Sequence, residues 1–344
     1  MIKKTLLAAA AAVTLVAAGD ADARTYRLQT SQNAGDFTLQ YLQEKWVPKL
    51  TAMSGGEIEL ELLPIASVVP PAETLDAVSA GILDGMHEAI SRFTGQDPAY
   101  GMLADMVAAY DNPDQGQTMC FNSGGRELLQ ELHDKYSGGT VHVVGCSPYT
   151  RESLPSAVAM HGIDDMKGVK IRSPEGLPAE VFKRAGAVSV PIPFSEVYTA
   201  LEKGIVDAAD ASAYVNNHAT GLHKVAPYPI YPGIHSQAIL HLAFNKDVWD
   251  AFTDGQKAMI ETWYAAALPD LRRHADLEDR KILKKDRAGE GAVKEVIDWP
   301  QADRDAFRAI ARGAWEDYAK LSPMAQKAYD VQMSFLRDYG LVKD

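Results

Sequence analysis

A segment near the middle of the chain constrains the fold most, because strand-like and helix-like patterns alternate in it. Short apolar runs typical of strands are separated by stretches with the spacing of amphipathic helices. Such a succession requires parallel strands joined by helical crossovers. The segment therefore predicts an α/β fold with largely parallel sheets. The expected strands are 168–173, 188–192 and 205–209, and the expected helices are 177–185 and 195–203.

The same patterns extend to both sides of this segment. Further strands are expected at 25–30, 57–63, 84–89, 140–146 and 293–298, and helices at 36–53, 70–81, 126–136, 254–285 and 301–339. The helix at 254–285 is long enough to link two lobes, and Pro269 is the place where an interruption is expected.

No linker divides the chain into sequential domains, so we expect two lobes that the chain crosses more than once. The predicted lobes are 24–147 plus 232–275, and 148–231 plus 276–344. A ligand would lie in the cleft between them, at the carboxyl ends of the strands.

The first residues have the form of a secretory signal peptide. Lys3 and Lys4 precede an apolar run at 6–18, and Ala21-Asp22-Ala23 follows as an A-x-A cleavage pattern. The run is shorter than the roughly 20 residues that cross a bilayer. We therefore predict a signal peptide at 1–23, cleavage near Ala23 and a periplasmic protein.

Charge and cysteine content restrict the partners and the chemistry. The formal net charge of −12 disfavours nucleic acid as a partner. The two cysteines, Cys120 and Cys146, are too few for a zinc site, and they form either one disulfide or two separately buried thiols.

Catalytic signatures do not emerge from the sequence. It contains no G-x-S-x-G, H-E-x-x-H, Walker A or G-x-G-x-x-G motif, and its histidines are scattered. These observations favour a binding protein over an enzyme, and no cofactor is expected.

Three stretches together resemble the solute receptors of tripartite ATP-independent periplasmic (TRAP) transporters, the DctP-like family. They are EIELELLPIASVVPPAETLDAVSAGILDG, GVKIRSPEG with PFSEVYTALEKGIVDAAD, and KVAPYPIYPG. The PPAETLDAVSAGILDG and YPIYPG forms are nearest to the branch that takes 2-oxo and 2-hydroxy acids. The resemblance implies a two-lobed receptor with a long helix across both lobes. Such a receptor closes on a small organic acid and delivers it to membrane permease subunits.

Arg172, in GVKIRSPEG, matches the arginine that binds the ligand carboxylate in that family. The chemistry agrees, because a guanidinium offers a planar fork to both carboxylate oxygens and forms strong, charge-assisted hydrogen bonds. The alternative is an arginine in an ordinary surface ion pair.

The resemblance also identifies departures at the place where the 2-oxo acid branch holds a metal ion beside the ligand. Asp210 and Ala211 stand where that branch has a Glu-Trp pair, Ser236 stands where it has a second acidic ligand, and Arg151 appears in place of a glutamine. We therefore expect no metal, with the guanidinium of Arg151 supplying the positive charge and Asp210 orienting it. The alternative places Arg151 on an exposed loop.

Two arginines in one cleft would favour a dicarboxylate, or a carboxylate with a second acceptor group. Tyr149, Phe194 and Tyr214 are candidate aromatic contacts, each also compatible with a place in the core, and His235 and Ser236 are candidates beside the YPG turn. Two other functions remain open, namely a periplasmic enzyme acting on a small acid and a receptor that feeds a sensor kinase.

Overall fold

The computed structural model describes residues 24–234 and 236–342. The predicted signal peptide at 1–23 and the candidate His235 lie outside the described residues. Within them, no helix has both the length and the apolar character that crossing a bilayer requires.

The larger of two sheets contains five strands in the order β2-β1-β3-β8-β4. Pairing is parallel between β1 and its neighbours β2 and β3, and antiparallel between β8 and its neighbours β3 and β4. The strands are β1 (Arg24–Thr30), β2 (Ile58–Leu63), β3 (Gly85–Ala89), β4 (Val141–Pro148) and β8 (Ile239–Asn245).

Strand β8 was not among the expected strands. All seven of its residues are buried, so its sequence lacks the alternation that marks a half-exposed strand.

The smaller sheet has the order β6-β5-β7 and is wholly parallel, as the alternating segment predicts. Its strands are β5 (Lys170–Ser173), β6 (Val188–Pro191) and β7 (Ala208–Ala209), joined by α7 (Leu177–Arg184) and α8 (Val197–Glu202). Among the described residues, four of the six strand pairings are parallel, which confirms the expected fold class.

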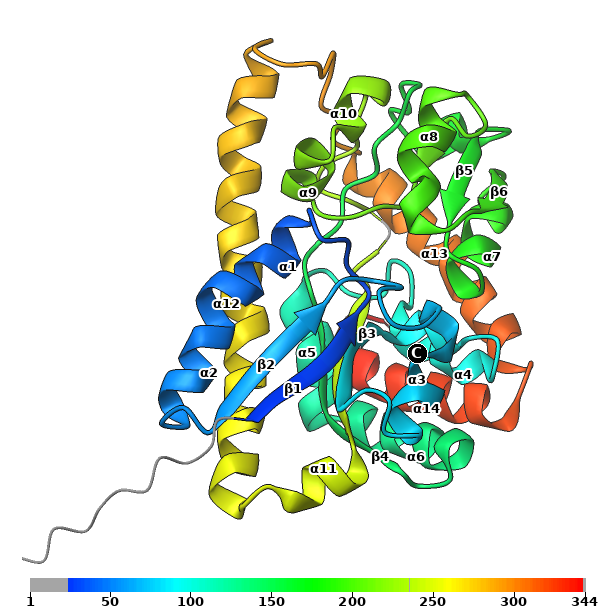
Figure 1. The fold of residues 1–344 in the computed structure, drawn as a ribbon. Coiled ribbons are helices and arrows are strands. Elements are labelled where there is room, and N and C mark those ends of the chain that lie inside the picture. Colours follow the sequence, from blue (N-terminus) through cyan, green and yellow to red (C-terminus); the bar gives the residue numbers. More distant parts are fainter. Residues whose placement is uncertain (1–23, 235, 343–344) are drawn as a thin grey trace, which may run out of the picture.

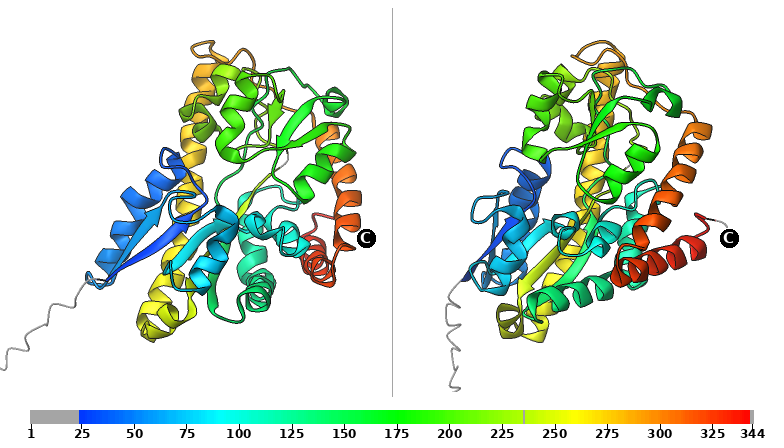
Figure 2. Two further views of the ribbon diagram at one scale, coloured as in Figure 1. Left: turned by 45° about the vertical axis from the view of Figure 1, so that its right-hand side comes forward. Right: turned by 90° about the vertical axis from the view of Figure 1, so that its right-hand side faces the viewer.

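The two sheets lie in separate parts of the molecule, and α12 (Asp254–Arg287) runs along both (Figures 1 and 2). Its first half packs on β4 and its carboxyl end lies beside α9 (Tyr214–Ala219). Pro269 does not interrupt this helix. Proline cannot donate to the carbonyl of Ala265, four residues earlier, and the side-chain amide of Gln117 donates to that oxygen instead, at 3.1 Å.

Several helices lie beside the larger sheet, and the expected helices 36–53, 70–81 and 126–136 are among them. The expected helix 36–53 is α1 (Phe37–Tyr41), a π-helical turn (Leu42–Trp46) and α2 (Val47–Met53) in succession. The rest of this group consists of α3 (Thr74–Ser79), α4 (Pro98–Ala104), α5 (Pro113–Asn122), α6 (Gly125–Ser137) and α11 (Lys246–Ala251).

Two expectations for the last third of the chain were wrong. The expected strand at 293–298 is an irregular segment with a single bridge between Ile297 and Ile230. The chain then forms α13 (Gln301–Ala319) and α14 (Pro323–Asp338). Helix α14 packs on α4 and α6 beside the larger sheet, so the predicted lobe 276–344 does not extend over it. The other lobe boundaries stay a prediction.

A disulfide joins Cys120 on α5 to Cys146 on β4, with their Cα atoms 5.7 Å apart. This resolves the alternative that the sequence left open. The bond fixes α5 to β4, the edge strand of the larger sheet, near the end at which the chain leaves β4.

Candidate ligand-binding site

A cleft of about 870 Å³, counted up to its open mouth, lies between the two sheets. It lies at the carboxyl ends of the strands, as the fold class predicts: Ser31 follows β1, Tyr149 follows β4, and Asp210 follows β7. Both parts of the molecule therefore contribute walls, and closure of one part on the other would change the volume of the cleft.

Arg172 lies on β5 and lines this cleft, and only 5% of it is exposed. Its Nε donates to the carbonyl oxygen of Ile192 at 2.8 Å, and its Nη1 donates to that of Asp210 at 2.5 Å. These carbonyls use two of the five N–H groups of the guanidinium. The edge formed by Nη1 and Nη2 therefore retains donors for a carboxylate.

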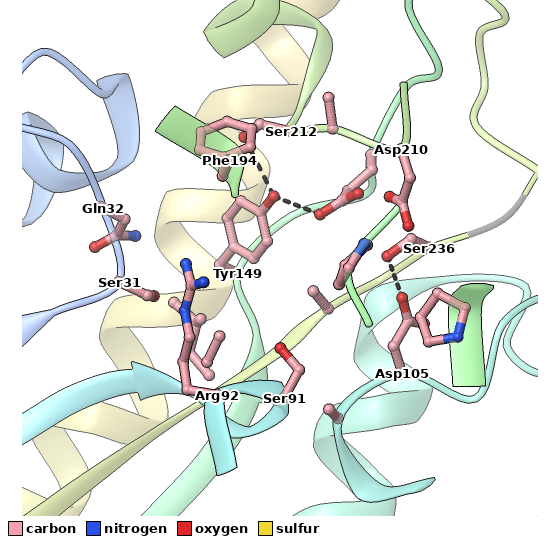
Figure 3. Close-up of a pocket in the computed structure, with 18 of the residues that line it drawn as sticks. Ser31, Gln32, Ser91, Arg92, Asp105, Tyr149, Phe194, Asp210, Ser212 and Ser236 are labelled. Atoms are coloured by element: carbon pink, nitrogen blue, oxygen red, sulfur yellow. Dashed lines mark hydrogen bonds between the residues drawn. The ribbon is translucent and has the colours of Figure 1, made fainter. Parts of the chain in front are cut away.

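Two aromatic side chains border the same space. The Arg172 guanidinium carbon lies 5.8 Å from the centroid of the Phe194 ring, which fits a cation–π contact. The Tyr149 hydroxyl bonds Glu152 Oε1 at 2.6 Å and Ser212 Oγ at 3.2 Å (Figure 3). Tyr149 and Phe194, both candidates from the sequence, thus line the cleft, and their contact with a ligand stays a prediction.

Three buried carboxyl groups, those of Asp105, Glu152 and Asp210, lie near one another in the wall of the cleft. Burial raises the pKa of Asp105 to about 8, and the charge of Asp210 adds to the effect. Burial also raises the pKa of Glu152 well above its usual range, and Asp210 adds to it through its charge and a hydrogen bond. Both shifts favour the protonated forms of Asp105 and Glu152.

Sequence reasoning identified Asp210 but missed Asp105 and Glu152. Neither stands in a recognisable motif, and both reach the cleft from irregular segments, after α4 and after β4. The hydroxyl of Ser236 donates to Asp105, which places Ser236 in the cleft wall as expected (Figure 3).

A second arginine in the cleft, Arg92, was also missed. It follows β3 and lies with Ser31 and Gln32 on one side of the cleft, whereas Asp105, Asp210 and Ser236 lie on the other (Figure 3). Its Nε is buried and has no hydrogen-bond acceptor among the described residues. A buried donor of this kind is satisfied when an acceptor enters the cleft.

The expected pairing of Arg151 with Asp210 was wrong. Arg151 does not line the cleft of Arg172 but a second cavity, which it shares with Arg304 and Arg308. Its Nη2 donates to the backbone carbonyl of Asp111. The cause is local, because the chain after β4 is irregular and directs Tyr149 and Glu152 to one cavity and Arg151 to the other.

Tyr214 is a core residue rather than a cleft residue. Its side chain is fully buried, packs on Tyr231 and Leu283, and donates to Asp286 Oδ2 at 2.7 Å. Burial and the neighbouring Asp286 raise its pKa. The structure therefore gives Tyr214 a role in holding α9 against α12.

The positions of Arg151, Asp105 and Glu152 change the reason for expecting no metal ion in the cleft. Arg151 is absent from the cleft wall, and Asp105 and Glu152 add oxygen donors of the kind that hard cations prefer. Independence from metal ions therefore stays a prediction to be tested, and it now depends on the protons that these two carboxyls hold.

The fold and the cleft define a two-lobed solute receptor. Residues 29–321 match the model of the bacterial extracellular solute-binding protein family 7 (DctP). The match covers most of the chain, and the chain belongs to this family.

Relatives and solved structures agree with this membership. A TRAP periplasmic solute binding protein from Rhodobacter sphaeroides, solved in an apo open form, is 39% identical, with a TM-score of 0.77 over 93% of this chain and 100% of that one. A TRAP solute binding protein from Bordetella bronchiseptica with calcium and picolinate is 23% identical, with a TM-score of 0.77 over 92% of this chain and 93% of that one. The monocarboxylate 2-oxoacid-binding periplasmic protein of Nostoc sp. is 23% identical over 83% of this chain and 77% of its own length.

Proposed function

We propose that the chain is a periplasmic receptor that binds one small organic acid in the cleft and delivers it, chemically unchanged, to the membrane subunits of a TRAP transporter. Membership of the DctP family and the Rhodobacter relative support this function. The predicted signal peptide at 1–23 supports export to the periplasm.

Arg172 is the observation that carries the proposal. A guanidinium that is almost fully buried in the wall of an open cleft, with donors left on one edge, is suited to a carboxylate. Desolvation lowers the pKa of Arg172, and the charge of Asp210 acts in the opposite direction. Arginine stays charged in proteins, and the remaining donors of Arg172 have no hydrogen-bond acceptor among the described residues.

The charges of the cleft favour a monocarboxylate over a dicarboxylate. Arg92 and Arg172 contribute two positive charges, while Asp36, Glu175 and the Glu152–Asp210 pair, which shares a proton, contribute about three negative charges. A monocarboxylate adds one negative charge to a set without excess positive charge, and each further carboxylate would be buried without compensation. The dicarboxylate expected from Arg151 is therefore not the ligand we propose.

The carboxyl and hydroxyl groups in the cleft wall determine which other groups the ligand can carry. Protonated carboxyls and the hydroxyls of Tyr149 and Ser236 can each donate or accept hydrogen bonds, which suits hydroxyl or keto groups next to the ligand carboxylate. The 2-oxoacids named for the Nostoc relative and the 2,3-diketo-L-gulonate named for an Escherichia coli relative have this combination of groups.

A thermal-shift screen of organic acids tests the proposal. We expect 2-oxo and 2-hydroxy monocarboxylates to raise the melting temperature, and dicarboxylates such as succinate to raise it less. Binding is detectable in this way because a ligand at 100 times its Kd adds about 2.7 kcal/mol of stability. No stabilisation by any carboxylate would contradict the proposal.

Two other functions are distinguished by separate measurements. A periplasmic enzyme would convert the bound acid, and mass spectrometry of the acid after incubation would detect this. A receptor for a sensor kinase would support signalling rather than uptake, and deletion of the permease subunits would leave its effect in cells intact. We expect no conversion, and uptake that requires the permease.

A further inference from the structure

A group of three potential metal ligands lies away from the ligand cleft, in the second lobe. It consists of His218, His223 and Asp286, and one ligand atom from each lies within 4.8 Å of the others. His218 is on the last turn of α9, His223 is on α10 (Leu222–Val225), and Asp286 is near the carboxyl end of α12. The α9–α10 segment and the end of α12 lie side by side in Figure 1.

His223 gives this group a second, independent feature. Only 2% of the residue is exposed, yet neither of its ring nitrogens has a hydrogen-bond partner among the described residues. Buried polar groups are almost always satisfied, so a histidine with both nitrogens unpartnered requires an explanation. A bound cation at one nitrogen would provide it.

The surroundings hold His223 in place while leaving its nitrogens without acceptors. The ring lies 4.3 Å from the ring of Tyr214 and 5.8 Å from that of His218, centroid to centroid. The Tyr214 hydroxyl donates to Asp286 Oδ2 at 2.7 Å. A carboxylate that accepts a hydrogen bond from a neighbouring side chain is a common arrangement for a metal ligand, because the bond fixes its orientation.

We propose that His218, His223 and Asp286 bind a first-row divalent metal ion, with Zn²⁺ as the best fit. Two imidazoles and one carboxylate are a ligand set that Zn²⁺ takes in proteins, with water as the fourth ligand. In a tetrahedral shell with bonds of about 2.0–2.2 Å, ligand atoms are about 3.3 Å apart. Each pair of ligand atoms therefore needs to approach by about 1.5 Å at most, and the exposed side chain of His218 can supply part of that movement.

The ion would connect α9, which begins shortly after the cleft residues 210–212, to α12, which runs along both parts of the molecule. The role of the ion would be structural, because it would join α9 and α10 to α12 in the same region as the Tyr214–Asp286 hydrogen bond. The inference does not depend on the proposed ligand.

Binding of Co²⁺ and Zn²⁺ to the untagged, chelator-treated protein tests the proposal. We expect one Co²⁺ per chain with the visible absorption of a tetrahedral site, displaced by one equivalent of Zn²⁺, and a rise in melting temperature with Zn²⁺ but not with Mg²⁺. His218→Ala removes an exposed ligand and is expected to weaken Zn²⁺ binding at least tenfold. Asp286→Asn, which keeps an acceptor for Tyr214, should weaken it similarly.

A matched control is His161→Ala, which removes another exposed histidine of the second lobe, one that bonds Glu295 at 3.1 Å. It should retain Zn²⁺ binding. Equal affinity in His218→Ala and His161→Ala, or no tetrahedral Co²⁺ spectrum in the unmodified protein, would overturn the proposal.

Discussion

Replacement of Arg172 by lysine is the perturbation whose effect follows most directly from the site. Lysine keeps the positive charge but cannot present two parallel N–H groups to a carboxylate. Hydrogen bonds to charged groups are worth about 1.5–3 kcal/mol, so the loss of one of two corresponds to about 2 kcal/mol. We expect affinity to fall about 30-fold, since each 1.4 kcal/mol is a factor of ten.

The variant should also be less stable without ligand, because of the positions of the arginine nitrogens. Nε and Nη1 donate to the carbonyls of Ile192 and Asp210, and a single ammonium group cannot reach both in the same way. One such bond lost corresponds to about 1.5–3 kcal/mol of unfolding free energy. Calorimetric titration with the best acid from the screen, well below the melting temperature of the variant, separates affinity from stability.

Arg151→Lys is the matched control, because Arg151 lines the second cavity and donates to the carbonyl of Asp111. Its effect on affinity should be less than twofold. Unchanged affinity in Arg172→Lys, or an equal loss in both variants, would refute the assignment of the carboxylate to Arg172.

Three further predictions concern protons, ions and the disulfide. The pKa of Asp105 is about 8 in the folded protein and about 4 in an unfolded chain, so its contribution to stability is present at low pH and declines as pH rises from about 4 to 8. Asp105→Asn should flatten this decline in melting curves measured at several pH values. An unaltered slope would refute the prediction. Ligand affinity should be the same in chelator-treated buffer and after addition of Na⁺ or Ca²⁺, and a tenfold loss on chelation would show that a cation completes the site. The double replacement of Cys120 and Cys146 by alanine should lower the unfolding free energy by about 3 kcal/mol in urea titrations, and a loss well below 1 kcal/mol would show that the bond adds little.

Much of the fold was predictable because strands and helices each require a characteristic spacing of apolar residues in the sequence. The parallel sheet of β5, β6 and β7 and the long helix α12 each follow from such patterns. Strand β8 was missed because its residues are buried on both faces, and α14 was assigned to the wrong lobe because an amphipathic helix does not specify which surface it covers.

The candidate site was predictable where a residue belongs to a family motif or directly follows a strand. Arg172, Asp210 and Ser236 line the cleft for that reason. Arg92 and Glu152 could not be identified, since a 3₁₀ turn after β3 and irregular backbone after β4 decide the direction of their side chains. The same cause separates Arg151 from Asp210, although both stand at positions that the family resemblance singled out.

A crystal structure of the protein with the acid selected by the thermal-shift screen tests the central claim most directly. The account predicts the ligand between the two sheets, with its carboxylate oxygens on the Nη1 and Nη2 edge of Arg172, its hydroxyl or keto group towards Asp105 and Glu152, and the cleft narrower than in the unliganded protein. A ligand in the cavity of Arg151, Arg304 and Arg308, or one whose carboxylate does not contact Arg172, would contradict it.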